Sequence, residues 1–370
     1  MTEVVVVGAG LIGASIARCV AERGIEVAVV EAARPAAGTS LATFAWVNAV
    51  GKQPRGYFNL NVEGAAEHRR LAEELGNDAW YHPGGNLEWS FEIDALRIKV
   101  DRHRDWGYPV EWLEPVHARE IEPDAVIEDG AGVAFYPGDA WVDPVLLVAR
   151  LLDHPGVTVQ SGVAVSRLDT AGGRVRGVQL ADGQRISGDA VVVATGPRAP
   201  ELLEPVGFHL PMRHAPGLLA LTEPAPIGVT RILHAPGIAL RPDGAGRLLL
   251  AADDLDKRIE PAGGDLPIVD AVEELLTRTR RILRGMTGVP VEVTRIGRRA
   301  LTSDGLPAIG PVPGVDGAYL AVMHSGVTLA PIVGRLVAAE LVGVPGDVLD
   351  DYRPARFATA GRAEPLPARG

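Results

Sequence analysis

Residues 3–31, EVVVVGAGLIGASIARCVAERGIEVAVVE, decide the fold of this chain. Val4–Val7 is a run of β-branched residues, which favours a strand buried on both faces of a sheet. A Gly-x-Gly-x-x-Gly turn and a stretch with helical periodicity follow, and Val27–Val30 predicts a second strand that ends at Glu31. This order of strand, glycine turn, helix, strand and acid is typical of a dinucleotide-binding unit.

The three glycines and the acid of this motif each have a physical role in nucleotide binding. Gly8 permits the tight turn, Gly10 lets the backbone approach a pyrophosphate, and Gly13 lets the helix lie close to the sheet. The helix N-terminus presents free N–H groups and a partial positive charge to the phosphates. Glu31 would accept hydrogen bonds from ribose hydroxyls, and its charge disfavours a 2′-phosphate, so NADP is not expected. The motif alone does not distinguish FAD from NAD.

Composition bounds the class of protein. The chain has 370 residues, of which 47% are hydrophobic and 22% are charged, which fits one large globular unit of two intertwined domains. Its net charge of −11 argues against a nucleic acid partner. The single cysteine, Cys19, can form no internal disulfide and is expected to pack as a small hydrophobe.

Two further absences in the sequence set expectations about location and metals. No apolar run reaches the ~18 residues of a membrane span, and the first strand begins too early for a signal peptide, so we expect a cytoplasmic protein with no membrane span. The histidines are scattered without the spacing of metal ligands, so no metal is expected.

Polar residues follow the nucleotide-binding unit. Thr39 and Ser40 offer hydroxyls where a pyrophosphate or flavin would lie, although ordinary helix capping explains either one equally well. Trp46 is followed by Asn48 and Lys52, and these side chains could line a pocket. Packing in the core is an equally good interpretation of Trp46.

Four later segments complete the expected outline. Residues 189–196, DAVVVATG, predict a second apolar strand that returns to the nucleotide sheet. Residues 200–226 are rich in proline and predict a loop. Residues 318–322 predict a strand, and a final helix is expected over about residues 327–341.

Three stretches together resemble the FAD-dependent D-amino acid oxidase superfamily, which includes glycine oxidase, sarcosine oxidase and D-amino acid dehydrogenases. The first is residues 4–31 with Gly38-Thr39-Ser40, and the second is residues 191–196. The third covers residues 299–311, including DGLPAIGP, and residues 324–331. In this family an Asp-Gly-x-Pro-x-x-Gly-Pro motif before a strand and a glycine-rich helix start is typical of the flavin site.

The resemblance implies an α/β fold with two domains. One is a Rossmann-like FAD-binding domain of the glutathione-reductase type, assembled from residues 1–80, 142–205 and 290–370. The other is a substrate domain built on an antiparallel β-sheet, from residues 81–141 and 206–289.

The same resemblance places FAD along the glycine turn, the acid, the Thr-Ser pair and the start of the last helix. Main chain at Val165 would contact the adenine, and residues around Gly326 would meet the pyrimidine edge of the flavin. The implied cofactor-binding residues are Gly8, Gly10, Leu11, Ile12, Gly13, Glu31, Ala32, Thr39, Ser40, Val165, Ala194, Thr195, Gly196, His324, Ser325, Gly326, Val327 and Thr328. Covalent attachment in this family uses a cysteine or histidine. Because Cys19 is misplaced and no histidine closely follows Ser40, FAD should be non-covalent.

Candidate catalytic residues follow from the same alignment. Arg299 aligns with the family's arginine that binds the substrate carboxylate, and a planar guanidinium suits that two-bond contact. A salt bridge at a strand end is the alternative, and the adjacent Arg298 is a rival for the role. Arg241 is a second candidate, and His324 would lie near the flavin, as a proton-transfer group or as a structural hydrogen-bonding group. The expected substrate pocket comprises Trp46, Asn48, Arg241 and Arg299.

We therefore expect an FAD-dependent oxidoreductase that oxidises the C–N bond of an amine or amino acid by hydride transfer to flavin N5, giving an imine. Its partners would be a small-molecule amine, amino acid or related acid, and oxygen or another electron acceptor; a homodimer is possible. The alternative is oxidation of a 2-hydroxy acid or other alcohol, with His324 as the base. More distant alternatives are a non-catalytic or RNA-modifying flavoprotein and an NAD dehydrogenase.

The chain also departs from the family pattern. Residues 248–250 lack the lysine that activates oxygen in sarcosine oxidases, which leaves both oxidase and dehydrogenase activity open. Ala251, Ala252 and Met323 stand where many relatives have glycine. The sequence therefore resembles an outlying branch of the family.

Overall fold

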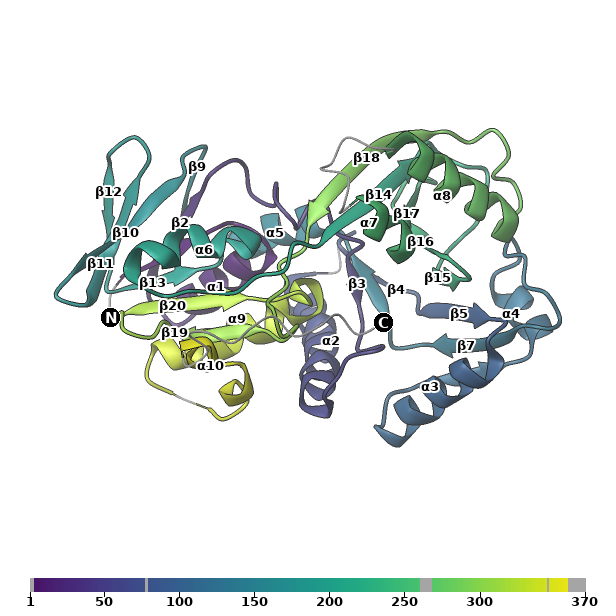
Figure 1. Ribbon diagram of the computed structural model, residues 1–370, viewed down its shortest axis with the longest axis horizontal. Coiled ribbons are helices and arrows are strands. Elements are labelled where there is room, and N and C mark those ends of the chain that lie inside the picture. Colours follow the sequence, from purple (N-terminus) through teal and green to yellow (C-terminus); the bar gives the residue numbers. More distant parts are fainter. Residues whose placement is uncertain (1–2, 77–78, 260–267, 345, 359–370) are drawn as a thin grey trace.

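The computed structural model describes residues 3–76, 79–259, 268–344 and 346–358, and it forms two lobes (Figure 1). One lobe is built on a six-stranded sheet in the order β19-β20-β13-β1-β2-β9. All neighbouring strands run parallel except β19 and β20. The strands are β1 Glu3–Val7, β2 Glu26–Glu31, β9 Val157–Ser161, β13 Ala190–Val193, β19 Ala308–Pro311 and β20 Ala318–Val322.

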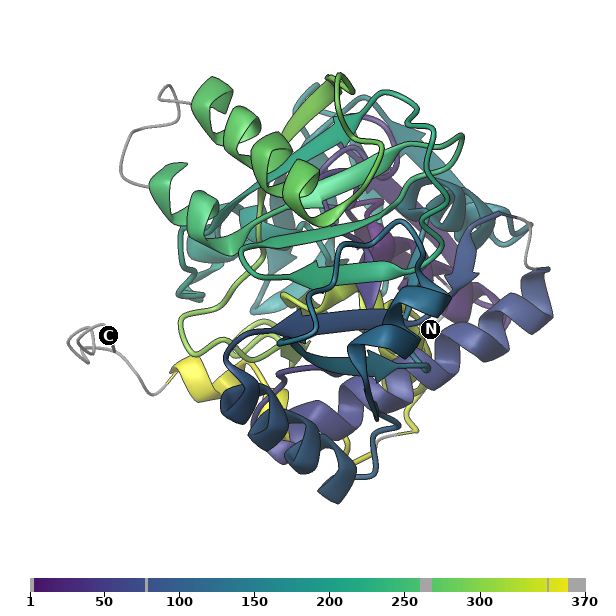
Figure 2. The same cartoon turned by 90° about the vertical axis from the view of Figure 1, so that its right-hand side faces the viewer.

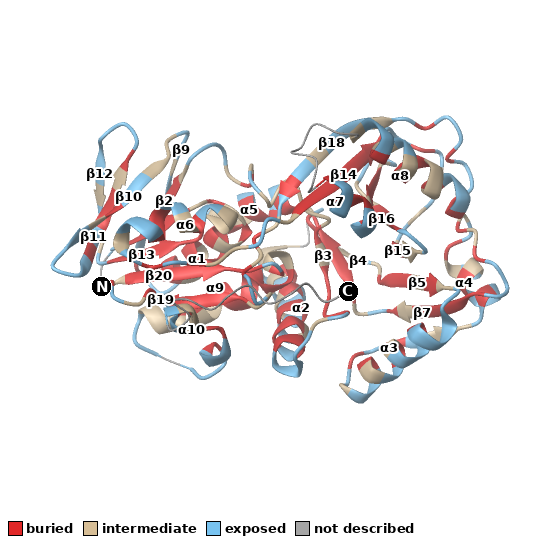
Figure 3. Ribbon diagram, in the orientation of Figure 1, coloured by how far each residue is buried: buried red, intermediate tan, exposed pale blue. Residues whose placement is uncertain are grey.

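Alternate residues of β1 pack into two different cores, which is why the run of valines is needed. Val4 and Val6 face a layer formed by helices α1 (Leu11–Ala21) and α9 (Gly326–Leu341). Val5 and Val7 face the opposite core. That core is covered by a small sheet and a short helix: β10 Val165–Ala171, β11 Arg174–Leu180, β12 Arg185–Ser187 and α6 Ala199–Leu203. Both faces of β1 are therefore buried. Strands β13 and β20 of the same sheet are also buried (Figure 3).

Helices α1 and α9 approach closely because α9 has a glycine at their contact. A Cβ on Gly334 would lie 2.4 Å from Ser15 Oγ and 2.7 Å from the Ser15 carbonyl oxygen. Two more helices pack beside this pair: α2 Arg55–Leu75 against α9, and α5 Pro144–Leu152 against α1. Cys19 on α1 is a free cysteine packed beside this core, and burial raises the pKa of its thiol to about 12.

The second lobe is built on an eight-stranded, mostly antiparallel sheet in the order β18-β14-β17-β16-β15-β5-β7-β6. Helices α7 and α8 cover one face of this sheet (Figure 2), and α3 lies on the other face. The strands are β5 Asn86–Ser90, β6 Glu111–Leu113, β7 Gly132–Tyr136, β14 Pro216–Thr222, β15 Ile232–Ala235, β16 Ile238–Pro242, β17 Leu248–Ala251 and β18 Val291–Arg298. The helices are α3 Ile93–Asp105, α4 Pro115–Ile121, α7 Asp253–Ile259 and α8 Ile268–Ile282.

A small three-stranded sheet lies between the lobes. Its order is β3-β8-β4, with β3 at Trp46–Val47, β4 at Tyr81–Pro83 and β8 at Ala140–Val142. The chain closes with a short helix, α10 at Ala355–Ala358. The small sheet carries the expected pocket residue Trp46 to the junction of the two lobes.

Two expectations differ from the observed elements. The proline-rich residues 200–226 are not all loop, because β14 runs through them and every one of its residues is buried. Its apolar run Leu218–Leu221 sits between prolines, and burial in the sheet outweighs the turn signal of those prolines. The expected boundary at residue 290 also differs from the sheet membership, because β18 pairs along its length with β14 in the second lobe.

Candidate cofactor and active site

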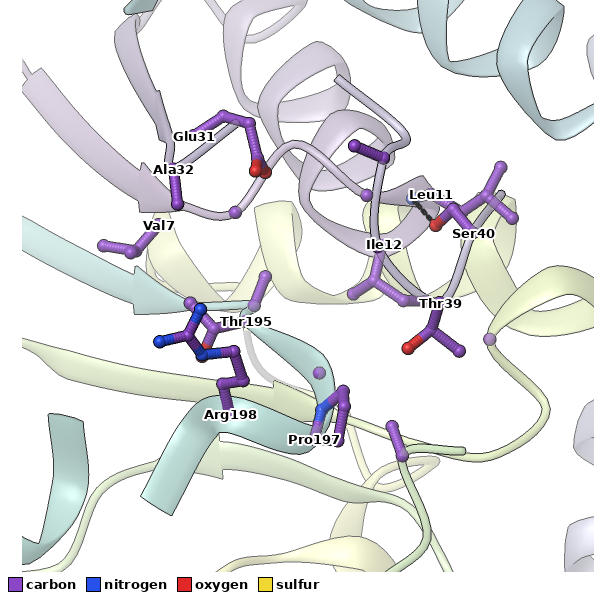
Figure 4. Close-up of a pocket in the computed structure, with 18 of the residues that line it drawn as sticks. Val7, Leu11, Ile12, Glu31, Ala32, Thr39, Ser40, Thr195, Pro197 and Arg198 are labelled. Carbon is purple, nitrogen blue, oxygen red and sulfur yellow. Dashed lines mark hydrogen bonds between the residues drawn. The ribbon is translucent and has the colours of Figure 1, made fainter. Parts of the chain in front are cut away.

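A cavity of about 360 Å³ opens at the carboxyl ends of the parallel strands of the first lobe (Figure 4). Four segments that are distant in sequence meet there: the turn after β1, the end of β2, the turn after β13 and the segment after β20. Such a crevice is the usual ligand position in an open α/β sheet. Of the residues expected to hold a cofactor, all line this cavity except Gly13, Ser325 and Thr328.

The glycine turn is tightly packed, so its glycines are sterically required. Gly8 has φ +103°, and a Cβ there would lie 2.7 Å from the Ala194 carbonyl oxygen. A Cβ on Gly13 would lie 1.8 Å from the Gly8 carbonyl oxygen, so this residue packs α1 onto the turn without reaching the cavity. A Cβ on Gly10 would lie 3.0 Å from Ser40 Oγ.

The start of α1 leaves backbone donors available to a ligand. The first bond within the helix runs from Ala14 N–H to the Gly10 carbonyl oxygen (2.9 Å), so the N–H groups before it have no partner in the helix. Ser40 Oγ accepts the N–H of Leu11 at 3.0 Å (Figure 4). The N–H of Ile12 and the positive end of the helix dipole therefore face the cavity, which suits a pyrophosphate.

Glu31 is held in place by backbone donors on both sides. Its two carboxylate oxygens accept the N–H of Ala9 at 2.8 Å and the N–H of Ala33 at 3.0 Å. Each oxygen keeps a further lone pair for a ribose hydroxyl. Arg198, which sequence reasoning missed, lines the same end of the cavity and pairs with Glu201 (Figure 4). The only sequence signal that could have identified Arg198 is its position two residues after Gly196.

One buried polar atom in the cavity wall supports the fit of a nucleotide. Thr195 lines the cavity, and its Oγ1 is buried without a hydrogen-bond partner among the residues that the structure describes. A buried hydroxyl without a partner is unfavourable, so a ligand that bonds to it would be stabilised. Together with the free N–H groups and Glu31, this wall fits a dinucleotide.

The other end of the cavity lies at the start of α9. His324, Gly326 and Val327 line it. Ser325 and Thr328 lie behind this wall and fix it, because Ser325 Oγ accepts Tyr57 OH at 2.7 Å and Thr328 Oγ1 accepts the N–H of Asn48 at 3.2 Å.

Helix α2 supports the same point from outside the cavity. His68 is fully buried, and its Nε2 donates to the Val327 carbonyl oxygen at 2.8 Å. Burial lowers the pKa of His68 to about 4, so its ring is neutral at pH 7. A Cβ on Gly64 would lie 2.6 Å from the Thr328 carbonyl oxygen. The start of α9 is therefore held against α2 by a hydrogen bond and by close backbone packing.

Three of the expected substrate-pocket residues are held by the protein itself. Trp46 Nε1 donates to Asp139 Oδ2 at 2.9 Å, and its ring lies 4.3 Å from that of His234. Asn48 is buried beside Thr328. Arg241 is buried, donates to the Phe44 carbonyl oxygen at 2.6 Å and pairs with Asp243 at 2.6 Å. Its guanidinium therefore already has protein partners.

Arg299 lies at the junction of the lobes and forms two ion pairs. Its Nη2 is 2.5 Å from Asp256 Oδ2 and 3.4 Å from Asp253 Oδ1, both on α7. Burial raises the pKa of Asp256, and the Leu218 N–H and the Arg299 guanidinium act in the opposite direction. The neighbouring Arg298 contributes its carbonyl oxygen, which accepts Thr39 Oγ1 at 2.7 Å.

His324 connects this cluster with the cavity. Its exposed surface faces the cavity, and its depth in the protein lowers its pKa to about 4, with the charges of Lys52 and Arg299 acting in the same direction. Burial also lowers the pKa of Lys52, and Asp253 opposes that shift. Lys52 comes from the segment before α2, whereas Asp253 and Asp256 come from α7, so no local sequence pattern identifies the three as a group.

Two features are absent from the part of the chain that the structure describes. None of their helices combines the length and the apolar character that crossing a bilayer requires. Within the same residues, no three side chains of the metal-binding types gather into one cluster.

The parallel sheet, the glycine turn and the cavity at the carboxyl ends of the strands are those of a dinucleotide-binding protein. The model of the DAO family, described as FAD dependent oxidoreductase, matches residues 3–340, and the chain belongs to this family. FAD is therefore the cofactor of this protein. The walls of the cavity fit a dinucleotide.

Several relatives resemble the chain over nearly its whole length. Glycine oxidase of Pseudomonas aeruginosa is 30% identical, over 97% of this chain and 99% of its own. The uncharacterised oxidoreductase YurR of Bacillus subtilis is 27% identical, over 96% and 99%. The crystal structure of glycine oxidase from Geobacillus kaustophilus superposes with a TM-score of 0.83 at 25% identity, over 96% of this chain and 99% of that one.

Proposed function

We propose that this protein oxidises the C–N bond of a small amine or amino acid, with oxygen or another acceptor taking the electrons afterwards. Glycine oxidases among its relatives support this substrate class. FAD, when bound, supplies the hydride acceptor of the reaction and is held without a covalent link. The first lobe would hold the cofactor, and the second lobe would close over the substrate.

The observation that carries this proposal is the wall at the start of α9. His68 and Gly64 fix this helix end from behind, and His324 and Val327 line the cavity in front of it. A helix N-terminus stabilises negative charge that develops nearby. The chain thus supplies a preorganised positive end where the reduced cofactor would be anionic.

The roles of the other residues follow from their positions. Arg299 would neutralise a substrate carboxylate at the junction of the lobes. Trp46, held by Asp139, would form an apolar side of the substrate pocket. No strong base is required if the amine binds in its neutral form, so orientation and exclusion of water are the main contributions of the protein.

The alternative substrate, a 2-hydroxy acid, needs a base to take the hydroxyl proton. His324 is the candidate, but burial lowers its pKa to about 4, which makes it a weak base at neutral pH. The glycine oxidases among the relatives favour amine oxidation over alcohol oxidation. The net charge of −11 also disfavours an RNA substrate.

The test is an anaerobic titration of the purified holoenzyme, followed by its visible absorbance. Glycine, both enantiomers of larger amino acids, primary and secondary amines, and 2-hydroxy acids are added separately. We expect bleaching of the flavin by an amino acid or amine and none by the hydroxy acids. Bleaching by hydroxy acids alone would establish the alternative, and readmission of air shows whether oxygen is the acceptor.

A further inference from the structure

Both ion pairs of Arg299 use its Nη2, the nitrogen that any two-bond contact with a carboxylate requires. An arginine can bind a carboxylate with two bonds through Nη1 and Nη2 or through Nε and Nη2, and both arrangements use Nη2. Asp256 and Asp253 both contact Nη2. Within the described residues, no other hydrogen bond of this side chain occurs. A substrate carboxylate can therefore form two bonds to Arg299 only if one aspartate gives way.

The two aspartates differ in how firmly they are held. The side chain of Asp256 is 6% exposed, and its Oδ1 also accepts the N–H of Leu218 on β14 at 2.7 Å. The side chain of Asp253 is 91% exposed and lies 3.4 Å from the arginine. An exposed pair at this distance contributes little, whereas breaking a buried pair with a second hydrogen bond is costly.

Strand β14 packs against the side chain of Arg299. A Cβ on Gly217 would lie 3.3 Å from Arg299 Nε and 3.4 Å from its Nη2, so the guanidinium rests against the backbone of β14. Asp256 is bonded to the next residue of the same strand, Leu218. Strand β14 and the Asp256 carboxylate therefore both restrict the position of the guanidinium.

We propose that Asp256 is a positioning residue that orients Arg299, and that Asp253 is a placeholder that a substrate carboxylate displaces. This rests on the proposed function and narrows its substrate class to amines that carry a carboxylate. The incoming carboxylate takes the Nη2 hydrogen released by Asp253 and a second bond from Nε or Nη1. Asp256 keeps its own bond to Nη2 throughout.

The two aspartates then predict opposite effects of the same substitution. Asp256→Asn has one acceptor oxygen for two donors, so Arg299 loses its orientation and carboxylates bind more weakly. Asp253→Asn removes a competing negative charge, so carboxylates bind as tightly or more tightly. Asp254→Asn is the matched control, because Asp254 lies on the same helix and pairs with Arg278 instead.

The experiment titrates benzoate into each holoenzyme and follows the shift of the flavin absorbance. Benzamide, which has the same shape without the charge, is the reference ligand. We expect the benzoate Kd to rise about tenfold or more in Asp256→Asn, to fall up to about fivefold in Asp253→Asn, and to stay unchanged in Asp254→Asn. With the substrate found by the anaerobic titration, KM should follow the same order while kcat changes less.

The outcomes separate this inference from the proposed function. If no amine or amino acid bleaches the wild-type flavin, the proposed function fails. If amino acids bleach it but the wild type does not bind benzoate, or Asp256→Asn binds it as well as the wild type, this inference fails alone. Weaker binding in Asp253→Asn also overturns it, and because Asp253 is exposed, this arm holds even if Asp256→Asn does not fold.

Discussion

Single residues of the glycine turn decide whether the cavity can receive a nucleotide. Gly10 has no unusual φ, so a side chain there is not strained by its backbone. Its constraint is space, because a Cβ would lie 3.0 Å from Ser40 Oγ, and that hydroxyl caps the N–H of Leu11. The residue therefore acts on binding more than on folding.

We predict that Gly10→Ala weakens FAD binding by about tenfold or more while the protein still folds, because the added methyl group displaces Ser40 and occupies the approach of the pyrophosphate. FAD affinity is measured by fluorescence titration of the stripped protein, and folding by circular dichroism. Gly130→Ala is the control, since a Cβ there meets nothing within 4 Å. Equal FAD affinity in the two variants would contradict the prediction.

Residue patterns predicted most of the expected cofactor residues that line the cavity, and they did not predict the ion pairs of Arg299. The glycines, Glu31 and the start of the last helix lie within short local motifs, and periodicity places each motif on an element. Arg299 is also visible in sequence, but its partners Asp253 and Asp256 are not, because they arrive from another element. Ion pairs between distant segments leave no periodic signal.

At the scale of elements, the contact between α2 and α9 links a helix outside the cavity to the cavity wall. A Cβ on Gly64 would lie 2.6 Å from the Thr328 carbonyl oxygen. Backbone cannot give way as a flexible side chain can, so a methyl group there must move α9. Helix α2 also carries His68, whose Nε2 donates a hydrogen bond to the Val327 carbonyl oxygen.

We therefore predict that Gly64→Ala destabilises the protein by about 1–3 kcal/mol, as overpacking does, and also weakens FAD binding. Gly56→Ala, on the same helix, has only ordinary contacts of 3.7 Å and 3.8 Å and gains helix propensity, so its stability should be unchanged or higher. Urea unfolding of both variants, with and without FAD, is the measurement. Equal stability of the two variants would show that α2 does not lock α9.

The sequence predicted strands well where both of their faces are buried, and less well where they are not. Strands β1, β13 and β20 are apolar on both faces, so their runs of residues are plain. The prolines around β14 predict a loop there, although neighbouring strands pair with β14 on both sides. Strand β18 lies at a sheet edge and is mostly exposed, including three consecutive residues, 292–294, so its sequence does not show which lobe it joins.

At the scale of the whole molecule, buried titratable groups make stability depend on pH in two directions. Burial lowers the pKa of His68 and His103 to about 4 and that of His234 to about 3. It raises the pKa of Asp139, between Tyr108 and Trp46, to about 7. The unfolded chain binds more protons at the histidines, and the folded chain binds more at the aspartic acid.

We predict that wild-type stability rises from about pH 4 to pH 6.5, because four histidines, these three and His324, outweigh one aspartic acid over that range. Asp139 opposes the rise. In its protonated form it stabilises the folded state, and this contribution is lost as the pH increases toward 7. Asp139→Asn should therefore steepen the rise, whatever its effect at a single pH. Urea midpoints at pH 4.5, 5.5 and 6.5, with FAD in fixed excess, provide the measurement, and parallel curves for both proteins would contradict this explanation.

The strand order of the six-stranded sheet has a consequence for synthesis of this polypeptide on the ribosome. Strand β1 emerges before the other strands of this sheet. Its neighbour β13 begins only at Ala190, and the outer strands β19 and β20 begin only at Ala308 and Ala318. Until α9 emerges, Val4 and Val6 lack part of the helix layer that covers them, because α1 supplies only the other part. A nascent chain must therefore keep its earliest apolar segment from aggregating through nearly the whole of translation, and it can capture its flavin only at the end.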